Sequence, residues 1–412
     1  MDSKFFEKNR ESLFNLMEED AIAIIFAQQS RTGKMPAVFT QKGEFYYLTG
    51  LKIPNAILLM CKKKERRDIF IFIEQNDPAL EVWLGKQTSQ NEVKQISGID
   101  NVLSLDAFPR VLHRYATAVE KGYFDFPYYP IDRVVNEELS VLSKIQSHYP
   151  TIKIKKIQPL IASLCTQKTP EEVANIKKAI EITHAGIQSI WKNARPGMME
   201  YELEAYFSFE CIRRGERQLA FPPIIASGIN ATILHYEKNI ARIGESDLVL
   251  LDLGAKYNEY CADISRTFPI SGKFTERQKE IYNEVLGVQQ EMIEYIIPGY
   301  TLRQLQQKAV ELITEALLRL RLINQKEEYT KYYMHGVSHH LGLAAHDLSN
   351  INDPLKPNSI ITVEPGIYIK EENIGIRIED DVIITENGCE DLSAMIPKKV
   401  DEIEKIMADS RK

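Results

Sequence analysis

Short apolar runs separated by turn-forming or charged residues characterise the front of the chain. Aliphatic and aromatic runs with polar boundaries are typical of β-strands. Predicted strands cover residues 21–26, 44–50, 55–60 and 68–73. A helix is predicted over 3–17 and a loop over 31–43, where Gly, Pro, Lys and Thr are concentrated. Helical and strand segments continue to about residue 146, so we predict an α/β domain here.

A strong helix start marks the rear part of the chain. Thr169 is a good N-cap residue, Pro170 suits the first helical position, and two glutamates follow in the first turn. A Lys/Ile-rich connection precedes this start. We therefore place the domain boundary in the connection, which gives domains at 1–157 and 158–412.

The rear part mixes long helices with strands that carry acidic residues. Predicted helices cover residues 170–193, 199–214, 275–296 and 301–321. The strands between them are joined by short turns, with few signals of parallel crossovers. Antiparallel pairing and an α+β class are therefore expected.

Length and composition limit the kind of protein. At 412 residues the chain is too long for one ordinary core and suits two domains. A hydrophobic content of 44% and a charged content of 26% are typical of soluble globular proteins. No apolar run reaches the roughly 18 residues of a membrane span, and the first residues lack the apolar core of a signal peptide. We therefore expect a cytoplasmic protein without membrane contact.

The cysteine content and the net charge limit the disulfides and the binding partners that we expect. Five cysteines are scattered without a CxxC pair, which argues against a disulfide framework. A net charge of −7 and a pI near 5.8 disfavour nucleic acid as a partner. The one basic run, residues 62–67, lies between two apolar strands and is interpreted as a solvated hairpin turn.

Asp252 and Asp263 lie in the two apolar halves of the stretch 247–268. Two strand-like runs flank a short polar connection there, which predicts a β-hairpin. The hairpin would bring Asp252 and Asp263 close to each other on adjacent strands.

Histidines and carboxylates recur among aliphatic residues in the stretch 335–380. An ionised carboxylate buried there without a partner would cost several kcal/mol. Glu364 and Glu379 bring the acidic set to four, and His339 adds an imidazole. Four carboxylates balance the summed charge of two divalent cations. The sequence therefore predicts a two-metal hydrolytic site.

Each motif taken by itself has a structural alternative. The spacing of His335 and His339 resembles a zinc-protease helix, but Gly336 replaces the required glutamate, and we reject that motif. His235 follows a Gly/Asn turn and would border a cleft, although the pattern alone favours a loop-packing histidine. The strand around Glu379 alone fits a solvated edge equally well. The concentration of histidines after residue 335 favours a site.

Taken together, these residues resemble the creatinase-like, or pita-bread, metallopeptidases, which include methionine aminopeptidase, prolidase and Xaa-Pro aminopeptidase. Residues 45–50 and 81–85 of the front part are similar to the N-terminal domain of Xaa-Pro aminopeptidase. The resemblance implies a C-terminal pita-bread catalytic domain, a smaller α/β domain before it, and a homodimer or homotetramer. The motifs that carry it are Asp252 with Asp263, His335-Gly-Val-Ser-His339, His346-Asp347, Val363-Glu364-Pro-Gly and Arg377-Ile-Glu379-Asp380.

The resemblance also implies a set of metal ligands. Two divalent ions, usually manganese and sometimes cobalt or zinc, would be bound, with a bridging hydroxide as the nucleophile. Glu364 would in addition handle the proton of that nucleophile. The implied ligands are Asp252, Asp263, His339, Glu364 and Glu379.

Five further residues receive roles from the same resemblance. His235 and His346 would bind the scissile carbonyl and its oxyanion. His335 would line a pocket for proline. Arg377 and Tyr368 would support the metal ligands from behind.

The resulting prediction is an aminopeptidase that removes the first residue from peptides with proline second. Prolidase, which shares the ligands but cuts only dipeptides, is the nearest alternative. Methionine aminopeptidase is disfavoured because it needs no front domain. An inactive pita-bread module that binds peptides is the alternative of another class, but such a module would have lost ligands, and every ligand position is filled here.

Overall fold

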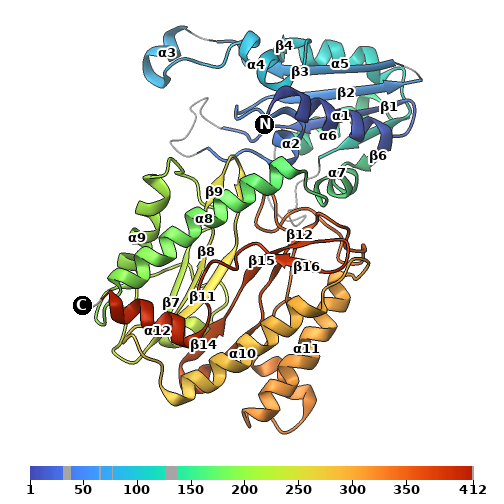
Figure 1. Cartoon of the computed structure of the whole chain (residues 1–412). Helices are drawn as coiled ribbons and strands as arrows, with labels where there is room; N and C mark the ends of the chain where they lie inside the picture. The colour runs from blue at the N-terminus through green and yellow to red at the C-terminus, as the bar shows by residue number, and fades with distance from the viewer. Residues whose placement is uncertain (31–38, 65, 77, 126–136, 411–412) are drawn as a thin grey trace. The chain divides into compact units, whose positions relative to one another are not determined.

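The computed structural model of this chain describes residues 1–30, 39–64, 66–76, 78–125 and 137–410. The chain divides into two compact units, Met1–Leu164 and Cys165–Lys412 (Figure 1). Helix α7 (Gln158–Cys165) begins at the predicted boundary, and the division between the units falls at its end. Within the predicted loop 31–43, residues 31–38 lie outside the described residues.

A mixed β-sheet forms the centre of the first unit. Among the described residues its strand order is β4-β3-β2-β1-β5-β6, with β2 antiparallel to both of its neighbours. Alternate residues of β1, including Ile22 and Ile24, pack on one face with α5 and α6 side chains such as Leu112 and Ile145. Helix α2 lies against β1 as well. A strand covered on both faces needs apolar residues at every position, and all of β1 is buried.

The elements of the first unit are α1 (Ser3–Leu16), β1 (Ala21–Phe26), α2 (Gly43–Thr49), β2 (Ile57–Lys63), β3 (Arg66–Ile73), α3 (Pro78–Leu84), α4 (Gln90–Ser97), β4 (Val102–Ser104), η1 (Leu105–Ala107), α5 (Phe108–Ala116), β5 (Lys121–Phe124), α6 (Glu137–His148), β6 (Lys153–Lys156) and α7.

The predicted strand over 44–50 is wrong, because this segment is helix α2. Phe45, Tyr46, Tyr47 and Leu48 are all buried, so the run carries no period of two or of 3.6 that would separate a strand from a helix. The helix ends at Gly50, whose φ of 70° is left-handed. The predicted strand at 21–26 and the helix at the N-terminus are confirmed.

The basic run 62–67 does form a hairpin between β2 and β3, but Lys62 is not solvated. Its ammonium donates hydrogen bonds to the carbonyl oxygens of Phe14 (2.9 Å) and Met17 (2.7 Å) at the end of α1. It also lies 3.1 Å from a carboxylate oxygen of Glu19. The lysine therefore caps a helix C-terminus, where unpaired carbonyls favour a cation.

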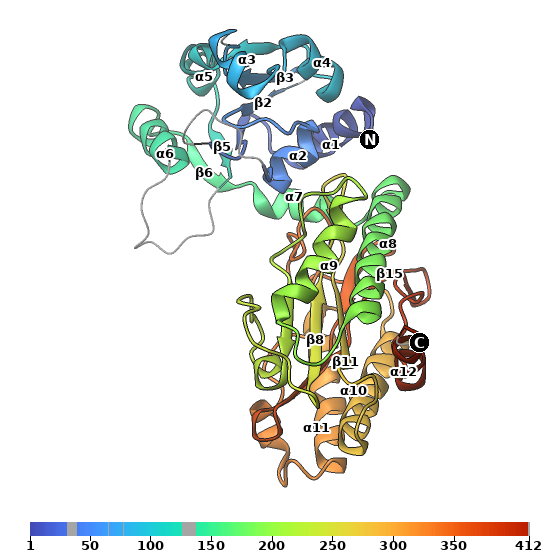
Figure 2. The same ribbon diagram turned by 90° about the vertical axis from the view of Figure 1, so that its left-hand side faces the viewer.

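Antiparallel strands and long helices build the second unit, as predicted. Strand β8 lies between β7 and β11, β15 lies between β12 and β16, and β13 pairs with β14. Helix α8 packs on α9 and α10 packs on α11, with strands between the two helix pairs (Figures 1 and 2). The predicted start of α8 is confirmed, since Thr169 and Glu172 form a capping box.

The elements of the second unit are α8 (Pro170–Asn193), α9 (Glu200–Ile212), β7 (Ile224–Ser227), η2 (Gly228–Thr232), β8 (Leu248–Leu253), β9 (Lys256–Tyr257), β10 (Tyr260–Cys261), β11 (Ile264–Pro269), α10 (Glu276–Tyr295), α11 (Leu302–Arg319), η3 (Lys326–Lys331), β12 (Ile360–Val363), β13 (Gly366–Ile369), η4 (Lys370–Glu372), β14 (Ile374–Arg377), β15 (Asp380–Ile384), β16 (Cys389–Asp391) and α12 (Val400–Asp409).

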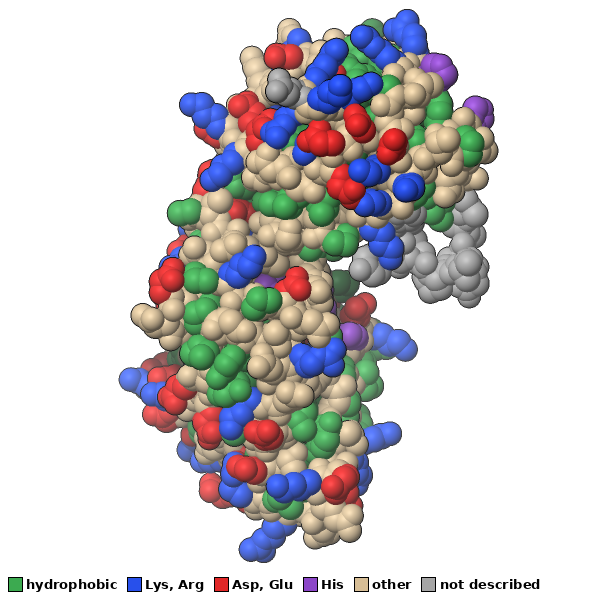
Figure 3. All heavy atoms as spheres, turned by 90° about the vertical axis from the view of Figure 1, so that its right-hand side faces the viewer, with side chains coloured by type: hydrophobic (Ala, Val, Ile, Leu, Met, Phe, Trp, Pro, Cys, Tyr) green, Lys and Arg blue, Asp and Glu red, His purple; other side chains and the backbone are tan. Residues whose placement is uncertain are grey.

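The five cysteines are free thiols. Across the described ranges, no helix combines the length and apolarity that crossing a bilayer requires. On the face drawn in Figure 3, basic and acidic side chains are interspersed rather than gathered into a basic tract.

A substitution at Gly375 in β14 tests the close packing of this strand against η2. A Cβ at Gly375 would lie 1.9 Å from the carbonyl oxygen of Ala231, so Gly375→Ala must displace backbone. We expect a loss of about 1–3 kcal/mol, as for other overpacked sites, and a lower melting temperature in thermal denaturation of the metal-free protein. Gly388→Ala is the control, because its nearest contact would be an ordinary 3.7 Å. Equal melting temperatures for the two variants would contradict the packing.

Candidate metal centre

The predicted hairpin is confirmed, and it brings two acidic residues to one place. Strand β8 pairs antiparallel with β11, so that Asp252 lies opposite Ser265. Asp263 immediately precedes β11, after the small ribbon of β9 and β10. Side-chain alternation along paired strands thus places both carboxylates on one side of the sheet.

The other two acids lie at the ends of strands. Glu364 follows the last residue of β12, where Pro365 interrupts the strand. Glu379 lies between β14 and β15, and its backbone N–H donates a 3.1 Å hydrogen bond to the carbonyl of Ser265. This bond ties Glu379 to the strand that follows Asp263.

The structure brings all five predicted ligands together. One donor atom each from Asp263, His339 and Glu379 lies within 4.8 Å of the others. His339 Nε2 is 3.6 Å from Asp263 Oδ2 and 3.4 Å from Glu364 Oε1. The charge of Asp252 acts on Asp263, Glu364 and Glu379 and raises the pKa of each.

Burial and mutual repulsion make this cluster costly in its ionised form. Burial raises the pKa of Asp263 and of Glu379 far above the ordinary values, and the neighbouring carboxylates raise both further. Burial likewise raises the pKa of Glu364 to about 8. Like charges at this spacing cannot all stay ionised unless a cation joins them.

Two divalent cations fit these residues. Asp252 Oδ1 is buried and has no hydrogen-bond partner among the described residues. Carboxylate oxygens with one imidazole nitrogen are a donor set suited to Mn²⁺, Co²⁺ or Zn²⁺. An acceptor oxygen with no donor, inside a cluster of excess negative charge, is suited to bind a cation.

His339 has the protonation state that a metal ligand needs. Its Nδ1 contacts the carbonyl oxygen of His340 at 3.2 Å, so Nδ1 carries the proton and Nε2 keeps a lone pair toward the acids. Burial, assisted by the neighbouring His346, lowers the pKa of His339 to about 4. The imidazole is therefore neutral near pH 7.

Arg377 is the cation that links the acids to the residues behind them. Its guanidinium donates to Asp252 Oδ2 (2.6 Å), to Ser265 Oγ (2.8 Å) and to the Tyr368 hydroxyl (3.0 Å). Ser265 in turn donates a 2.7 Å hydrogen bond to Glu379 Oε2. One buried arginine therefore orients Asp252 directly and Glu379 through a serine.

His335 belongs to the same network. Its Nδ1 donates to the carbonyl of Gly336 (2.7 Å), so Nε2 accepts a 2.8 Å hydrogen bond from the Tyr368 hydroxyl. Tyr333 and Tyr368 meet the imidazole edge to face, with ring centroids 4.9 and 5.5 Å from it. His335 therefore lies in an aromatic setting beside Glu364, whose carboxylate is 3.7 Å from it.

The remaining two histidines lie at the rim of the cluster. His346 stacks on His339 with ring centroids 3.9 Å apart and an interplanar angle of 17°. His235 is exposed, and it is near enough to His335 and His346 that its charge adds to burial in lowering the pKa of both. All ten residues singled out in the sequence thus lie in or beside one cluster.

Sequence reasoning missed several residues that position this cluster. Arg266 is fully buried and donates to the backbone oxygen of Glu379 (2.7 Å) and to Asp380 Oδ1 (2.6 Å). The buried Lys168 contacts Asp347 Oδ2 at 3.0 Å, next to His346. An isolated basic residue in an apolar strand was the available signal for Arg266, whereas nothing local distinguishes Lys168.

Comparisons with known proteins identify the class. The family described as "Metallopeptidase family M24" matches residues 174–386. The domain family described as "Aminopeptidase P, N-terminal domain" matches residues 6–123. The chain belongs to metallopeptidase family M24, as a metalloaminopeptidase with an aminopeptidase P N-terminal domain. The predicted family, the two-domain α+β fold and the enzyme class are thereby confirmed.

Individual relatives resemble the chain along nearly its whole length. The Xaa-Pro aminopeptidase of Escherichia coli is 32% identical over 432 aligned positions, covering 99% of this chain and 98% of the relative. A Bacillus anthracis structure, provisionally assigned as an aminopeptidase P, is 42% identical with a TM-score of 0.95, covering 100% of this chain and 99% of that one. Zinc-substituted Escherichia coli aminopeptidase P in complex with product is 30% identical with a TM-score of 0.91, at the same coverage.

Removing one charge from the cluster should remove metal. Asp263→Asn and Glu379→Gln keep the shape of the side chain but lose a negative charge, so we expect each to bind less than the full complement of metal. Peptidase activity should fall by on the order of 100-fold or more, since even residues behind a metal site cost 10–100-fold. Elemental analysis of dialysed protein measures the metal content.

Asp125→Asn is the matched control, because Asp125 is a buried acid of the first unit that pairs with Lys42. It should keep wild-type metal content. Two metals per chain and normal turnover in Asp263→Asn would show that the ligand set is wrong.

Proposed function

We propose that this chain hydrolyses the bond between the first residue and a proline in second position, with two divalent cations as cofactors. Manganese is the proposed metal, with cobalt or zinc as alternatives. The observation that carries the proposal is the cluster of four buried or half-buried carboxylates around His339, with a partnerless oxygen on Asp252. The relatives named Xaa-Pro aminopeptidase support the substrate class. The proposed ligands are Asp252, Asp263, His339, Glu364 and Glu379.

In the proposed reaction the metals and the protein side chains have different roles. Two divalent cations, when bound, lower the pKa of a water molecule and offset negative charge that develops on the scissile carbonyl. Glu364 is the residue that we propose to receive the proton of that water, and its closeness to His339 (3.4 Å) and His335 (3.7 Å) supports this role. Thr362 donates a hydrogen bond to Glu364 Oε1 (3.4 Å), which helps to fix its orientation.

His346 and His235 are the proposed donors to the substrate carbonyl. Burial lowers the pKa of His346, so it is a neutral imidazole whose remaining N–H can donate to an oxygen. Its stacking on His339 holds the ring beside the proposed ligands. A donor held in place before the reaction stabilises the developing oxyanion without further reorganisation.

Proline recognition follows from the chemistry of the scissile bond. The Xaa-Pro amide is tertiary, so its nitrogen has no hydrogen for the enzyme to bind. A site for it must contact the ring through apolar surface and polarise the carbonyl strongly. His335, with its aromatic neighbours Tyr333 and Tyr368, is the proposed surface for the proline ring.

We infer a cytoplasmic location and a homo-oligomer, either a dimer or a tetramer. Free cysteines are typical of reducing compartments, which supports the location. Val82 and Trp83 on α3 are 85% and 82% exposed, and we propose that this adjacent apolar pair contributes to the contact between subunits. Light scattering after gel filtration measures the oligomeric state.

A panel of three peptides tests the proposed specificity. Ala-Pro-Ala should lose its first residue, Ala-Pro should be a poorer substrate, and Ala-Ala-Ala should hardly be cut. Mass spectrometry over a time course with added Mn²⁺ measures the products. A preference for Ala-Pro would indicate a prolidase instead, and equal cleavage of Ala-Ala-Ala would remove the argument from proline.

His346→Ala separates carbonyl binding from metal binding. The variant should keep its metals and lose on the order of 100-fold in kcat, as expected when one preorganised donor is removed. His184→Ala is the control, since His184 is a partly buried histidine of α8 outside the cluster. Loss of metal from His346→Ala would make His346 a ligand, and unchanged kinetics would make it structural.

A further inference from the structure

The segment 227–241, which carries His235, has little regular structure apart from η2. Such a segment does not hold a side chain in place through strand or helix hydrogen bonds. Something else must therefore fix the position of His235 beside the cluster.

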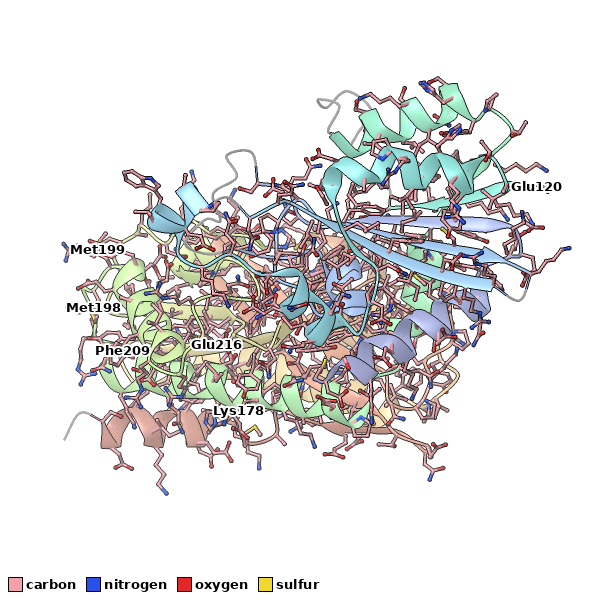
Figure 4. The ribbon with its side chains drawn as sticks, turned by 90° about the horizontal axis from the view of Figure 1, so that it is seen from above. Glu120, Lys178, Met198, Met199, Phe209 and Glu216 are labelled. Carbon is pink, nitrogen blue, oxygen red and sulfur yellow. The ribbon has the colours of Figure 1, made fainter. Side chains whose placement is uncertain are left out.

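One buried carboxylate accepts five hydrogen bonds from this segment, in addition to those that the Asn239 side chain forms with Pro223, Ile225 and Glu204. Glu200 is the first residue of α9 and is 0% exposed. Figure 4 shows its neighbours Met198 and Met199 at the outer edge of the second unit, whereas Glu200 itself is buried. Its Oε1 accepts from Ser227 N (2.8 Å), Ser227 Oγ (2.8 Å) and Asn230 Nδ2 (3.1 Å).

The other oxygen of Glu200 binds the far end of the segment. Oε2 accepts from the Tyr236 hydroxyl (2.9 Å) and from Ala241 N (2.8 Å). The beginning, middle and end of the segment thus converge on a single side chain. All five donors are neutral, so the buried charge depends on hydrogen bonds that only this conformation of the segment provides.

The segment is also held from its opposite side. Gly375 of β14 approaches Ala231 of η2 so closely that a Cβ on the glycine would meet its carbonyl oxygen. Strand β14 ends at Arg377, which orients Asp252. The segment therefore packs between α9 and β14, a strand of the metal centre.

We propose that Glu200 is a positioning residue for the reaction, acting through His235. Its carboxylate accepts hydrogen bonds from both ends of the segment 227–241, and this holds the imidazole of His235 facing His335 and His346. This inference rests on the proposed function, because it takes His235 to be a donor to the substrate carbonyl.

Glu200→Gln tests the proposal with almost no change in shape. The amide NH₂ cannot accept a hydrogen bond from Ala241 N, so the closure of the segment is broken at one end. Hydrogen exchange of the full-length, metal-loaded protein, followed by mass spectrometry, should show faster exchange in peptides from 227–241 and unchanged exchange in β8 and β11. Metal content should stay at the wild-type level, and kcat should fall by roughly 10- to 100-fold.

A double-mutant cycle with His235→Ala separates positioning from general stability. If Glu200 acts through His235, adding Glu200→Gln to His235→Ala should cause little further loss of kcat. Glu172→Gln is the matched control, because Glu172 is a buried acid in the first turn of α8 that accepts from Thr169 N and the Tyr260 hydroxyl. Its effect should add fully to that of His235→Ala and leave exchange in 227–241 unchanged.

Tyr236→Phe keeps the proposal testable if Glu200→Gln does not fold. It removes one of the five donors and should produce a smaller change in the same direction. Unchanged exchange in 227–241, or losses of kcat that add fully in the cycle, would overturn the proposal. Normal kcat in His235→Ala, with faster exchange in Glu200→Gln, would instead refute the proposed role of His235 and remove the reaction that Glu200 supports.

Discussion

The second unit is organised around the cost of placing four carboxylates side by side in a largely buried cluster. Burial raises the pKa of Asp263, Glu364 and Glu379, and the charge of Asp252 raises all three further. The guanidinium of Arg377 neutralises part of the negative charge through its ion pair with Asp252. The rest calls for divalent cations, and the donor set around His339 is suited to them. Without metal these acids would have to take up protons, and we expect divalent cations to replace those protons.

Strands and strand ends hold the acids, whereas loops hold His235, His335 and His346. A polar side chain of a helix or linker forms hydrogen bonds that help to hold each of these loops. Gln306 of α11 bonds the backbone of the His335 loop at 2.7 and 3.1 Å. Lys168 contacts Asp347 beside His346, and Glu200 gathers the segment of His235. These hydrogen bonds fix the position of an imidazole that the irregular backbone alone would leave free to move.

Local patterns in the sequence predicted the parts of this structure that depend on local physics. The hairpin of Asp252 and Asp263 follows from strand alternation and a polar turn, and α8 follows from its capping box. Helix α2 was missed because an apolar run buried on all sides has no diagnostic period. Glu200, Lys168 and Gln306 were missed because their partners lie far away in the sequence.

Anomalous scattering from a crystal grown with Mn²⁺ is the most direct test of the metal centre. The account predicts two manganese peaks enclosed by the carboxylates and His339, with one of them meeting the partnerless Oδ1 of Asp252. No peak at the cluster, or manganese bound only elsewhere in the chain, would contradict it.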